Sequence, residues 1–406
     1  MTDTQTPLAL NPNVAAMRPS ATLAASARAK AMVRAGRDVI ALTAGEPDFD
    51  TPAPIVEAAH RALDAGHFHY TPNAGVPALR EAIAHKLQIQ NGIDRCAEDV
   101  LCSNGAKQSV AQAVLAVCGP GDEVLIPTPY WTSYPEQARL AGATPVVVET
   151  RPEDGYALRP EALEAALTER TRLLILTSPS NPTGAVLSRD EQEDLAAVLR
   201  RHPHVLVVAD EIYEYVVFDA EHTSFATLPG MAERTMTVNG FSKGYAMTGW
   251  RLGYAAGPHD WAAAMAKIQS QFTSGPNAIT QQAALAAFGM GLDPIRAMTA
   301  AFRERRDAVW ARLSAIDGVT CPLPEGAFYL FPDVSALFGC RTPDGTRIDD
   351  ADALCGYLLE EYEVALVPGS AFGAPYGLRM SYATDLDTLS RAMDRVEAGI
   401  AALEPA

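Results

Sequence analysis

The feature that most constrains this fold is a repeated alternation of short, continuous apolar runs with helical patterns. A strand that is apolar on both sides must be covered on both faces, and strands connected by helices run mostly parallel. We therefore predict an α/β fold whose large domain is a mostly parallel sheet flanked by helices, with ligands bound at the carboxyl ends of its strands. The predicted strands are Asp99–Ser103, Glu123–Ile126, Thr144–Val148, Leu173–Thr177, Val205–Ala209, Thr235–Val238 and Leu252–Ala255. Helical patterns between them include Ala106–Val117, Arg159–Leu167, Arg189–Arg200 and Trp261–Gln271.

The length of 406 residues favours two domains, because single cores rarely grow so large. We predict an extended N-terminal arm at residues 1–25, a large domain at 48–289, and a smaller α+β domain formed by 26–47 and 290–406. The smaller domain contains a charged helical stretch, in which Arg303–Arg306 should form a solvated face. Its strand-like pieces are Gly326–Phe331, Val364–Val367 and Leu378–Tyr382, before a final helix.

The charge of the chain argues against two classes of partner. With 32 basic and 49 acidic residues, the formal net charge is −17, which repels nucleic-acid backbones and anionic lipid. No apolar run reaches the length of a transmembrane helix, and the N-terminus lacks the features of a signal peptide. The six cysteines lie far apart and form no CxxC pair, so we expect buried thiols in a reducing compartment. These observations predict a cytoplasmic protein that binds neither nucleic acid nor membrane.

One lysine lies in an unusual setting. In TMTVNGFSKGYAMTGWRLGY a strand ends in a glycine-flanked loop that carries Ser242 and Lys243, and Arg251 follows eight residues later. Most lysines are solvated, but Lys243 lies among apolar residues and glycine. Desolvation there would lower its pKa and favour the neutral amine that imine formation requires. Ser242 and Arg251 can donate hydrogen bonds to one phosphate.

A second strand end supplies a carboxylate. In VLVVADEIY an apolar strand is followed by Asp210, with Tyr213 one helical turn later. Pyridoxal phosphate (PLP) needs a carboxylate against its pyridine nitrogen, because a protonated ring is the stronger electron sink. Asp210 fits that role, although a strand-end or helix-capping aspartate is the alternative interpretation. Tyr213 could reach the ring hydroxyl.

Two more loops carry weaker signals. The NPTG turn contains Asn181, which is functional only if its amide lies beside a ring oxygen and a substrate carboxylate. In CSNGAKQ, the amides of Gly105, Ala106 and Lys107 open a helix and could hold a phosphate. This motif is not GxGxxG, so a dinucleotide site is poorly supported. Trp131 could stack on a flat cofactor, or it could simply pack in the core.

Taken together, the chain resembles the class I/II aminotransferases of PLP fold type I, and within them the bacterial and archaeal aspartate aminotransferases. The resemblance runs from about Pro19 to the last helix. Its densest matches are ALTAGEPDFDTP, YTPNAGVPALREAIA, NGAKQ, PYWTSYPE, SPSNPTGAV, ADEIYE, SKGYAMTGWRLGY, GAFYLFPD and LRMSYA. The resemblance implies a PLP enzyme that works as a homodimer with active sites at its interface.

The resemblance also implies a role for each matching residue. Lys243 would be the Schiff-base lysine and proton shuttle, Asp210 the partner of the pyridine nitrogen, and Tyr213 a ligand of the ring oxygen. Asn181 would contact both that oxygen and the substrate, and Trp131 would stack on the ring and border the substrate. The implied phosphate site comprises Gly105, Ala106, Lys107, Ser242 and Arg251, with Tyr70 from the neighbouring subunit.

Three residues are implied to bind substrate at its carboxylates. Arg379 in LRMSYA would clamp the α-carboxylate, and the backbone of Gly45 would line the same site. Lys107 would face the distal carboxylate of aspartate or glutamate. Two departures from the family pattern, Ser180 and Phe272, leave the chemistry intact but affect the expected substrate preference.

No metal is predicted. His67 and His69, and likewise His202 and His204, have i, i+2 spacing, but no cysteine or carboxylate cluster accompanies them in sequence. We interpret all four as solvated loop histidines.

Several functions share this constellation. The leading hypothesis is ping-pong transamination between an amino acid, aspartate or glutamate first, and a 2-oxo acid. An aromatic or prephenate-type aminotransferase is the nearest alternative. A β-eliminating PLP lyase is another, and it would release pyruvate and ammonia without an acceptor. A non-catalytic amino-acid sensor would need a fused DNA-binding domain, and the segment before Pro19 is too short for one.

Overall fold

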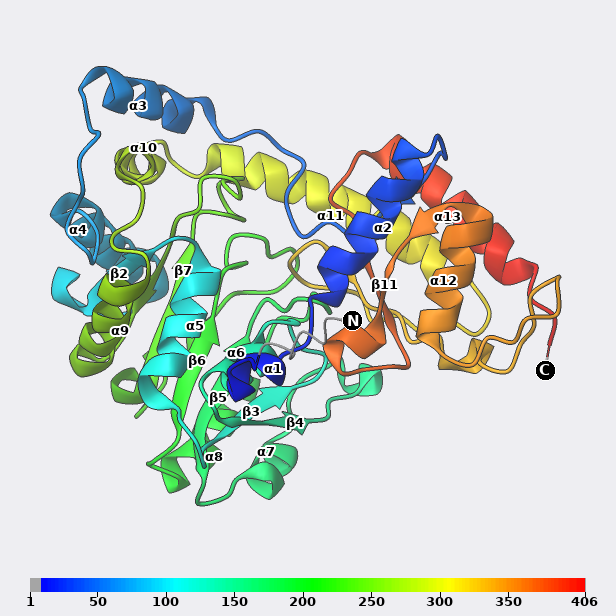
Figure 1. Ribbon diagram of the computed structural model, residues 1–406, viewed down its shortest axis with the longest axis horizontal. Helices are drawn as coiled ribbons and strands as arrows, with labels where there is room; N and C mark the ends of the chain where they lie inside the picture. Colours follow the sequence, from blue (N-terminus) through cyan, green and yellow to red (C-terminus); the bar gives the residue numbers. More distant parts are fainter. Residues whose placement is uncertain (1–8, 406) are drawn as a thin grey trace, which may run out of the picture.

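The computed structural model describes residues 9–405, and a large central sheet dominates it (Figure 1). Within these residues the sheet has seven strands in the order β2-β8-β7-β6-β5-β3-β4. Strand β8 runs antiparallel to both of its neighbours, and the other paired strands are parallel. The predicted mostly parallel sheet is therefore confirmed. Its strands are β2 (Val100–Ser103), β3 (Glu123–Pro127), β4 (Thr144–Val148), β5 (Thr171–Thr177), β6 (Leu206–Asp210), β7 (Thr235–Gly240) and β8 (Gly253–Ala256).

Helices cover both faces of this sheet because its strands are apolar on both sides. Along β5, Leu173 and Ile175 pack in a core cluster with α5 and α9, whereas Leu174 and Leu176 pack on the other face with α7 and α8. Helices α3, α4 and α10 cover the β2–β8 end. The bounds are α3 (Ala53–Asp64), α4 (Pro77–Lys86), α5 (Ala106–Val117), α6 (Tyr134–Leu140), α7 (Pro160–Ala166), α8 (Arg189–Arg201), α9 (His259–Phe272) and α10 (Ala278–Gly289).

A second group of elements lies beside the sheet, and the N-terminal helix α2 packs among them (Figure 1). Its strands form the antiparallel sheet β11-β12-β9 and the parallel pair β1-β10. Since Ile40 pairs with Val364, the segment after α2 joins the C-terminal part of the chain. The exact domain boundaries stay a prediction. The bounds are α2 (Ala21–Arg34), β1 (Ile40–Ala41), α11 (Asp293–Leu313), β9 (Tyr329–Leu330), α12 (Ala351–Tyr362), β10 (Val364–Ala365), β11 (Val367–Pro368), β12 (Leu378–Ser381) and α13 (Leu386–Ala401).

The prediction of an extended N-terminal arm is wrong for residues 9–25, which are partly helical. Residues 9–25 contain α1 (Pro12–Ala15) and the start of α2. The Asn11 side chain accepts from Asn13 N and caps α1, and the Ser20 hydroxyl accepts from Leu23 N at the start of α2. The same Asn, Pro and Ser residues that suggested an irregular segment are helix-initiating residues here. Residues 1–8 of the arm lie outside the described part.

Two surface expectations also need correction. Cys96 is exposed and Cys340 half-buried, whereas the other four cysteines are buried as expected. In the charged helix α11, Arg306 is 2% exposed and donates to Asp219, Asp307 and the Pro324 carbonyl, so it does not belong to a solvated face. Among residues 9–405, no helix combines the length and apolar character needed to cross a bilayer.

The edge of the sheet where the parallel strands end also receives Arg251. Because β8 is antiparallel, it begins at the edge where β6 and β7 end. Arg251 lies two residues before the start of β8, so it lies at the same edge as Asp210 and the loop after β7. The topology therefore gathers the strand-end residues at one place.

Candidate active site

A cavity of about 360 Å³ opens at this edge. It collects most of the residues that the sequence singled out, from both the large sheet and the C-terminal elements. The predicted residues in its lining are Gly45, Ala106, Lys107, Trp131, Asn181, Asp210, Tyr213, Ser242, Lys243, Arg251 and Arg379.

Lys243 lies in the wall of this cavity on the loop after β7. Burial lowers the pKa of its amine to about 8, with Glu46 opposing that shift. Its Nζ donates to the Gly45 carbonyl and lies 5.7 Å from the ring centroids of Tyr213 and Phe328. Burial among aromatic rings and a lowered pKa give this lysine a larger neutral fraction than a solvated lysine, as a nucleophilic amine requires.

Asp210 ends β6 and is 4% exposed. Burial raises the pKa of its carboxyl to about 6, although a hydrogen bond from Tyr134 acts in the opposite direction. The Tyr134 hydroxyl donates to Oδ2 at 2.8 Å, and the Ile212 amide donates to Oδ1 at 3.3 Å. A buried carboxylate held in this way can keep a proton on a basic ring nitrogen.

Tyr213 lies one turn beyond Asp210, and its hydroxyl is 2.9 Å from that of Tyr329 on β9. Both rings are buried, and burial raises the pKa of both phenols. Neutral phenols here can donate a hydrogen bond to an oxygen on a ligand ring.

Arg379 on β12 is 2% exposed and faces the same cavity. Its Nη1 donates to Asn181 Oδ1 at 3.0 Å and its Nη2 donates to the Thr43 carbonyl at 2.8 Å. Its Nε is buried without a hydrogen-bond acceptor among the described residues. A buried guanidinium with unused donor capacity is suited to a carboxylate. The Asn181 amide, whose oxygen already accepts from Arg379, keeps its N–H groups for a ligand.

The start of α5 forms a cradle for an anion. Gly105 has a φ of +89° and caps this helix without a side-chain hydrogen bond. A Cβ there would collide with the Arg251 guanidinium, and one on Gly253 would collide with the Ala106 amide. The α5 backbone and the Arg251 side chain therefore lie together, and Ser242 lines the same cavity. Helix amides, a hydroxyl and a guanidinium suit a phosphate dianion, so these residues fit the phosphate of PLP.

Lys107 and Trp131 both line the cavity. Lys107 Nζ lies 4.9 Å from the centroid of the Trp131 ring. Partial burial and the nearby Arg251 charge lower the pKa of Lys107. The ring of Trp131 contacts Tyr134 edge-on, with centroids 5.3 Å apart. The cavity thus has an aromatic wall with a cation over it.

Four residues named from the sequence lie outside this lining. Tyr70 is 99% exposed on its own chain and takes no part in the cavity. Ser180 lies in the loop after β5, and Phe272 at the end of α9 is 75% exposed. Gly105 is absent from the lining as well, but it contacts Arg251 directly.

The sequence interpretation missed several residues that line the cavity. Thr177 ends β5, so the strand-end rule could have found it. Tyr134 begins a helix, and no strand-end pattern points to it. Tyr329 comes from the second group of elements and reaches the site only through tertiary packing. Other missed lining residues are Ser20, Thr22, Leu23, Glu46, Thr132, Ile212 and Thr248.

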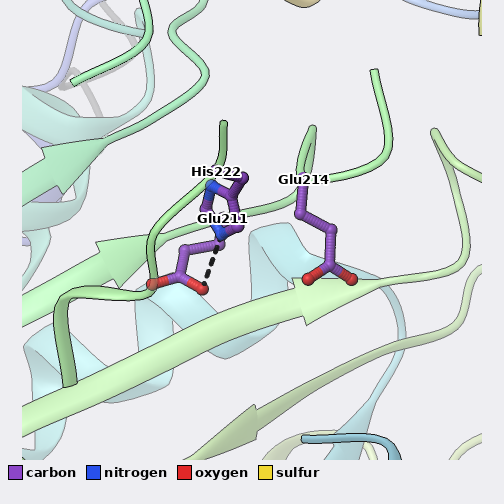
Figure 2. A group of neighbouring side chains, drawn as sticks. All are labelled: Glu211, Glu214 and His222. Atoms are coloured by element: carbon purple, nitrogen blue, oxygen red, sulfur yellow. Dashed lines mark hydrogen bonds and ion pairs between the residues drawn. The ribbon is translucent and has the colours of Figure 1, made fainter. Parts of the chain in front are cut away.

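A separate polar cluster lies immediately beyond Asp210. Figure 2 shows Glu211, Glu214 and His222, whose potential ligand atoms lie within 4.8 Å of one another. His222 Nε2 lies 3.2 Å from Glu211 Oε2. Lys86 forms an ion pair with Glu214, so an ammonium group already supplies positive charge there. We interpret the cluster as a buried ion network.

Of the two histidine pairs considered as metal ligands, His202 and His204 are bonded to other groups. His202 Nε2 lies 2.8 Å from Glu164, and His204 Nε2 lies 3.3 Å from the Thr168 carbonyl. His67 and His69 lie in the loop after α3.

Comparisons with known proteins identify the family of the chain. Residues 37–396 match the family model for aminotransferase class I and II. A Petunia hybrida protein called bifunctional aspartate aminotransferase and glutamate/aspartate-prephenate aminotransferase is 54% identical over 402 residues, which cover 98% of this chain and 84% of that protein. An aspartate/prephenate aminotransferase of Cereibacter sphaeroides is 48% identical, covering 97% of this chain and 99% of the relative.

Solved structures share the whole architecture. The aspartate aminotransferase of Rhizobium meliloti has a TM-score of 0.95 at 44% identity, covering 98% of this chain and all of that one. The aspartate aminotransferase of Thermus thermophilus, solved with maleate, has a TM-score of 0.90 at 42% identity, covering 96% and 99% of the two chains.

Proposed function

This chain belongs to the aminotransferase class I and II family, and from that membership we propose that it transfers an amino group between aspartate or glutamate and a 2-oxo acid. The observation that carries the proposal is the convergence of Lys243, Asp210 and Arg379 on one cavity. An amine, a carboxylate and a guanidinium are the groups that reversible amino transfer needs. The residue roles below are part of the proposal.

The enzyme is a PLP-dependent aminotransferase. When bound, PLP supplies an electron sink that withdraws negative charge from the substrate α-carbon. The Arg379 guanidinium binds the substrate α-carboxylate, with the Gly45 backbone beside it. Lys243 Nζ would carry the proton that leaves the substrate α-carbon, for which an amine with a pKa of about 8 is suited. Asp210 would keep the ring nitrogen of bound PLP protonated.

The remaining lining residues position the cofactor. Gly105, Ala106, Ser242 and Arg251 bind its phosphate, and Lys107 adds positive charge nearby. Tyr213 and Asn181 would donate hydrogen bonds to its ring oxygen, and Trp131 would pack against the ring. Purified enzyme assayed with a panel of amino acids and 2-oxo acids tests the proposed reaction. Release of ammonia and pyruvate without an acceptor would instead identify a β-eliminating lyase.

Lys107 carries the preference for a dicarboxylic substrate in this proposal. It lies at the cavity edge over Trp131, where its ammonium can meet a distal carboxylate. The Thermus thermophilus aspartate aminotransferase was solved with maleate, which is a dicarboxylate. We therefore propose aspartate and 2-oxoglutarate as the main pair. Because two relatives are named for prephenate and Trp131 gives the cavity an aromatic wall, prephenate or an aromatic oxo acid is the second candidate acceptor.

The Lys107→Ala variant should lose kcat/KM for aspartate about 10- to 100-fold, because a hydrogen bond to a charged group is lost. Monocarboxylic amino acids should be nearly unaffected. Steady-state kinetics with aspartate and with an aromatic amino acid measures both effects, and Lys107→Arg serves as the charge-retaining control. Equal losses on both substrates would show that Lys107 serves the cofactor and not selectivity.

We also propose that the protein acts as a homodimer. Tyr70 is fully exposed, and Phe68 beside it is 68% exposed, an unusual surface position for two aromatic rings. In the dimer, Tyr70 would reach the phosphate site of the neighbouring subunit. A cytoplasmic location stays a prediction from the sequence.

Hybrid dimers test the shared site. Mixing Lys243→Ala subunits with Tyr70→Phe subunits should give activity above the average of the two parents, because each hybrid contains one site intact in both respects. Activity after subunit exchange and sedimentation of the mixture measure this. An active monomer in sedimentation would contradict the proposal.

A further inference from the structure

The Tyr134 hydroxyl connects Asp210 to a second strand end. It donates to Asp210 Oδ2 at 2.8 Å and lies 2.6 Å from Thr177 Oγ1. The strand register explains this proximity, because Thr177 at the end of β5 pairs with Asp210 at the end of β6. Tyr134 is 2% exposed, so its hydroxyl depends on these two partners and not on bulk water.

Thr177, Tyr134 and Asp210 form a hydrogen-bond chain, and the charge of Asp210 fixes which groups donate in it. An ionised carboxylate only accepts hydrogen bonds, so Tyr134 must donate to Asp210. Its oxygen is then free to accept from the Thr177 hydroxyl. Polarised in this order, each bond strengthens the next, and the chain favours the charged form of Asp210. A protonated Asp210 would instead donate its own O–H, and the Tyr134 hydroxyl already donates toward it, so this hydrogen-bond chain disfavours the protonated form.

The ring of Tyr134 supports a second wall of the site. It meets Trp131 edge-on at an interplanar angle of 81°, and the Tyr134 amide donates to the Trp131 carbonyl at 3.0 Å. A phenylalanine at this position would keep that packing. The hydroxyl is therefore the part of Tyr134 that packing does not require.

We propose that Tyr134, supported by Thr177, is a positioning residue that keeps Asp210 ionised and aimed at the ring nitrogen of PLP. This inference rests on the role proposed above for Asp210. It assigns Tyr134 no contact with the substrate, so its effect should be the same for every amino acid.

Cofactor affinity separates this role from simple packing. The apoenzyme is titrated with PLP and with the analogue in which a C–H group replaces the ring nitrogen. The wild type should prefer PLP, because Asp210 can act only on the nitrogen. Tyr134→Phe should reduce that preference about 10- to 100-fold, the usual effect of a hydrogen bond to a charged group, and leave the affinity for the analogue unchanged. An equal loss of affinity for both compounds would overturn the proposal.

Two further variants make the result decisive. Thr177→Val should reduce the preference in the same direction but by less, and Thr177→Ser should restore it. If Tyr134→Phe does not fold, the two Thr177 variants carry the test. Thr177→Val would then contradict the proposal if it preferred PLP over the analogue as strongly as the wild type does. Asp210→Asn should abolish the preference. If it does not, the role of Asp210 itself is wrong. If Asp210→Asn loses the preference and Tyr134→Phe keeps it, only the present inference fails.

Discussion

The Lys243→Ala variant should lose about 10²- to 10⁴-fold in kcat for transamination from general-base catalysis alone, and more because the covalent attachment is lost as well. Lys243 is the proposed covalent attachment point for the cofactor as well as the proton carrier, and both roles disappear together. The phosphate cradle does not depend on the lysine, so the variant should still bind PLP. Its bound cofactor should have the absorbance of the free aldehyde.

Borohydride reduction of the wild type followed by peptide mass spectrometry identifies the attached residue. Lys267, exposed on α9, is the matched control, and Lys267→Ala should leave both activity and labelling unchanged. The pH adds an independent check. With a pKa of about 8, the neutral fraction of the Lys243 amine increases as the pH rises through that value. Capture of PLP by the apoenzyme should therefore accelerate between about pH 7 and pH 9. Label on another lysine would refute the assignment.

The central sheet could be predicted closely because its cause is local. Its strands are apolar on both sides, and the flanking helices have clear periodicity. The predicted bounds of Thr144–Val148 and Ala106–Val117 match β4 and α5. The strand ends then indicated where Asp210 and Lys243 should meet.

The N-terminal segment was mispredicted because its residues are typical both of irregular chain and of helix starts. Asn11 and Pro12 are common in irregular chain, but they also begin helices, and tertiary contacts decide between the two. Helix α1 packs against α6, and α2 packs against β1, β10 and β11. These contacts join parts of the chain that no local pattern connects.

The supporting residues of the site were the hardest to foresee. Tyr134 and Tyr329 look like ordinary core aromatics in sequence, and both are fully or nearly fully buried. Their importance comes from where their hydroxyls point, toward Asp210 and Tyr213 respectively. Local sequence carries no information about such an orientation. Arg306 shows the converse, because it looks like a surface charge but is buried against Asp219.

The second large effect concerns stability and the ion network beyond Asp210. The side chains of Lys86 and Glu214 are 3% and 5% exposed, and Lys86 also donates to Asn91 Oδ1 at 2.8 Å. Asn91 in turn donates to Glu214 Oε2 at 2.7 Å. Lys86→Met should lower the free energy of unfolding by about 3–5 kcal/mol, because it leaves a buried carboxylate without its cation. Denaturant unfolding of the apoenzyme at a fixed protein concentration measures the loss.

The pH dependence of this loss distinguishes an uncompensated charge from a cavity. In the wild type, burial raises the pKa of Glu214. Lys86, His222 and Asn91 together lower it by more, so the pKa lies below its ordinary value. Its contribution to stability is therefore present above the pKa of an unfolded glutamate, about 4.3, and is lost as the pH falls through the lower folded value. Without Lys86, burial dominates and the pKa of Glu214 should rise above its ordinary value. The sign then reverses, and the variant should lose stability as the pH increases toward neutrality.

The double variant Lys86→Met/Glu214→Leu is the matched control. It removes both charges and should recover most of the lost stability, since apolar replacements of a buried ion pair are often neutral or stabilising. His222 pairs with Glu211, so the network keeps one partner for that carboxylate. A single variant that is equally destabilised at pH 5 and pH 8 would show that Lys86, whose Nζ also lies 5.2 Å from the centroid of the Tyr215 ring, stabilises the fold through packing of its stem and not through its charge.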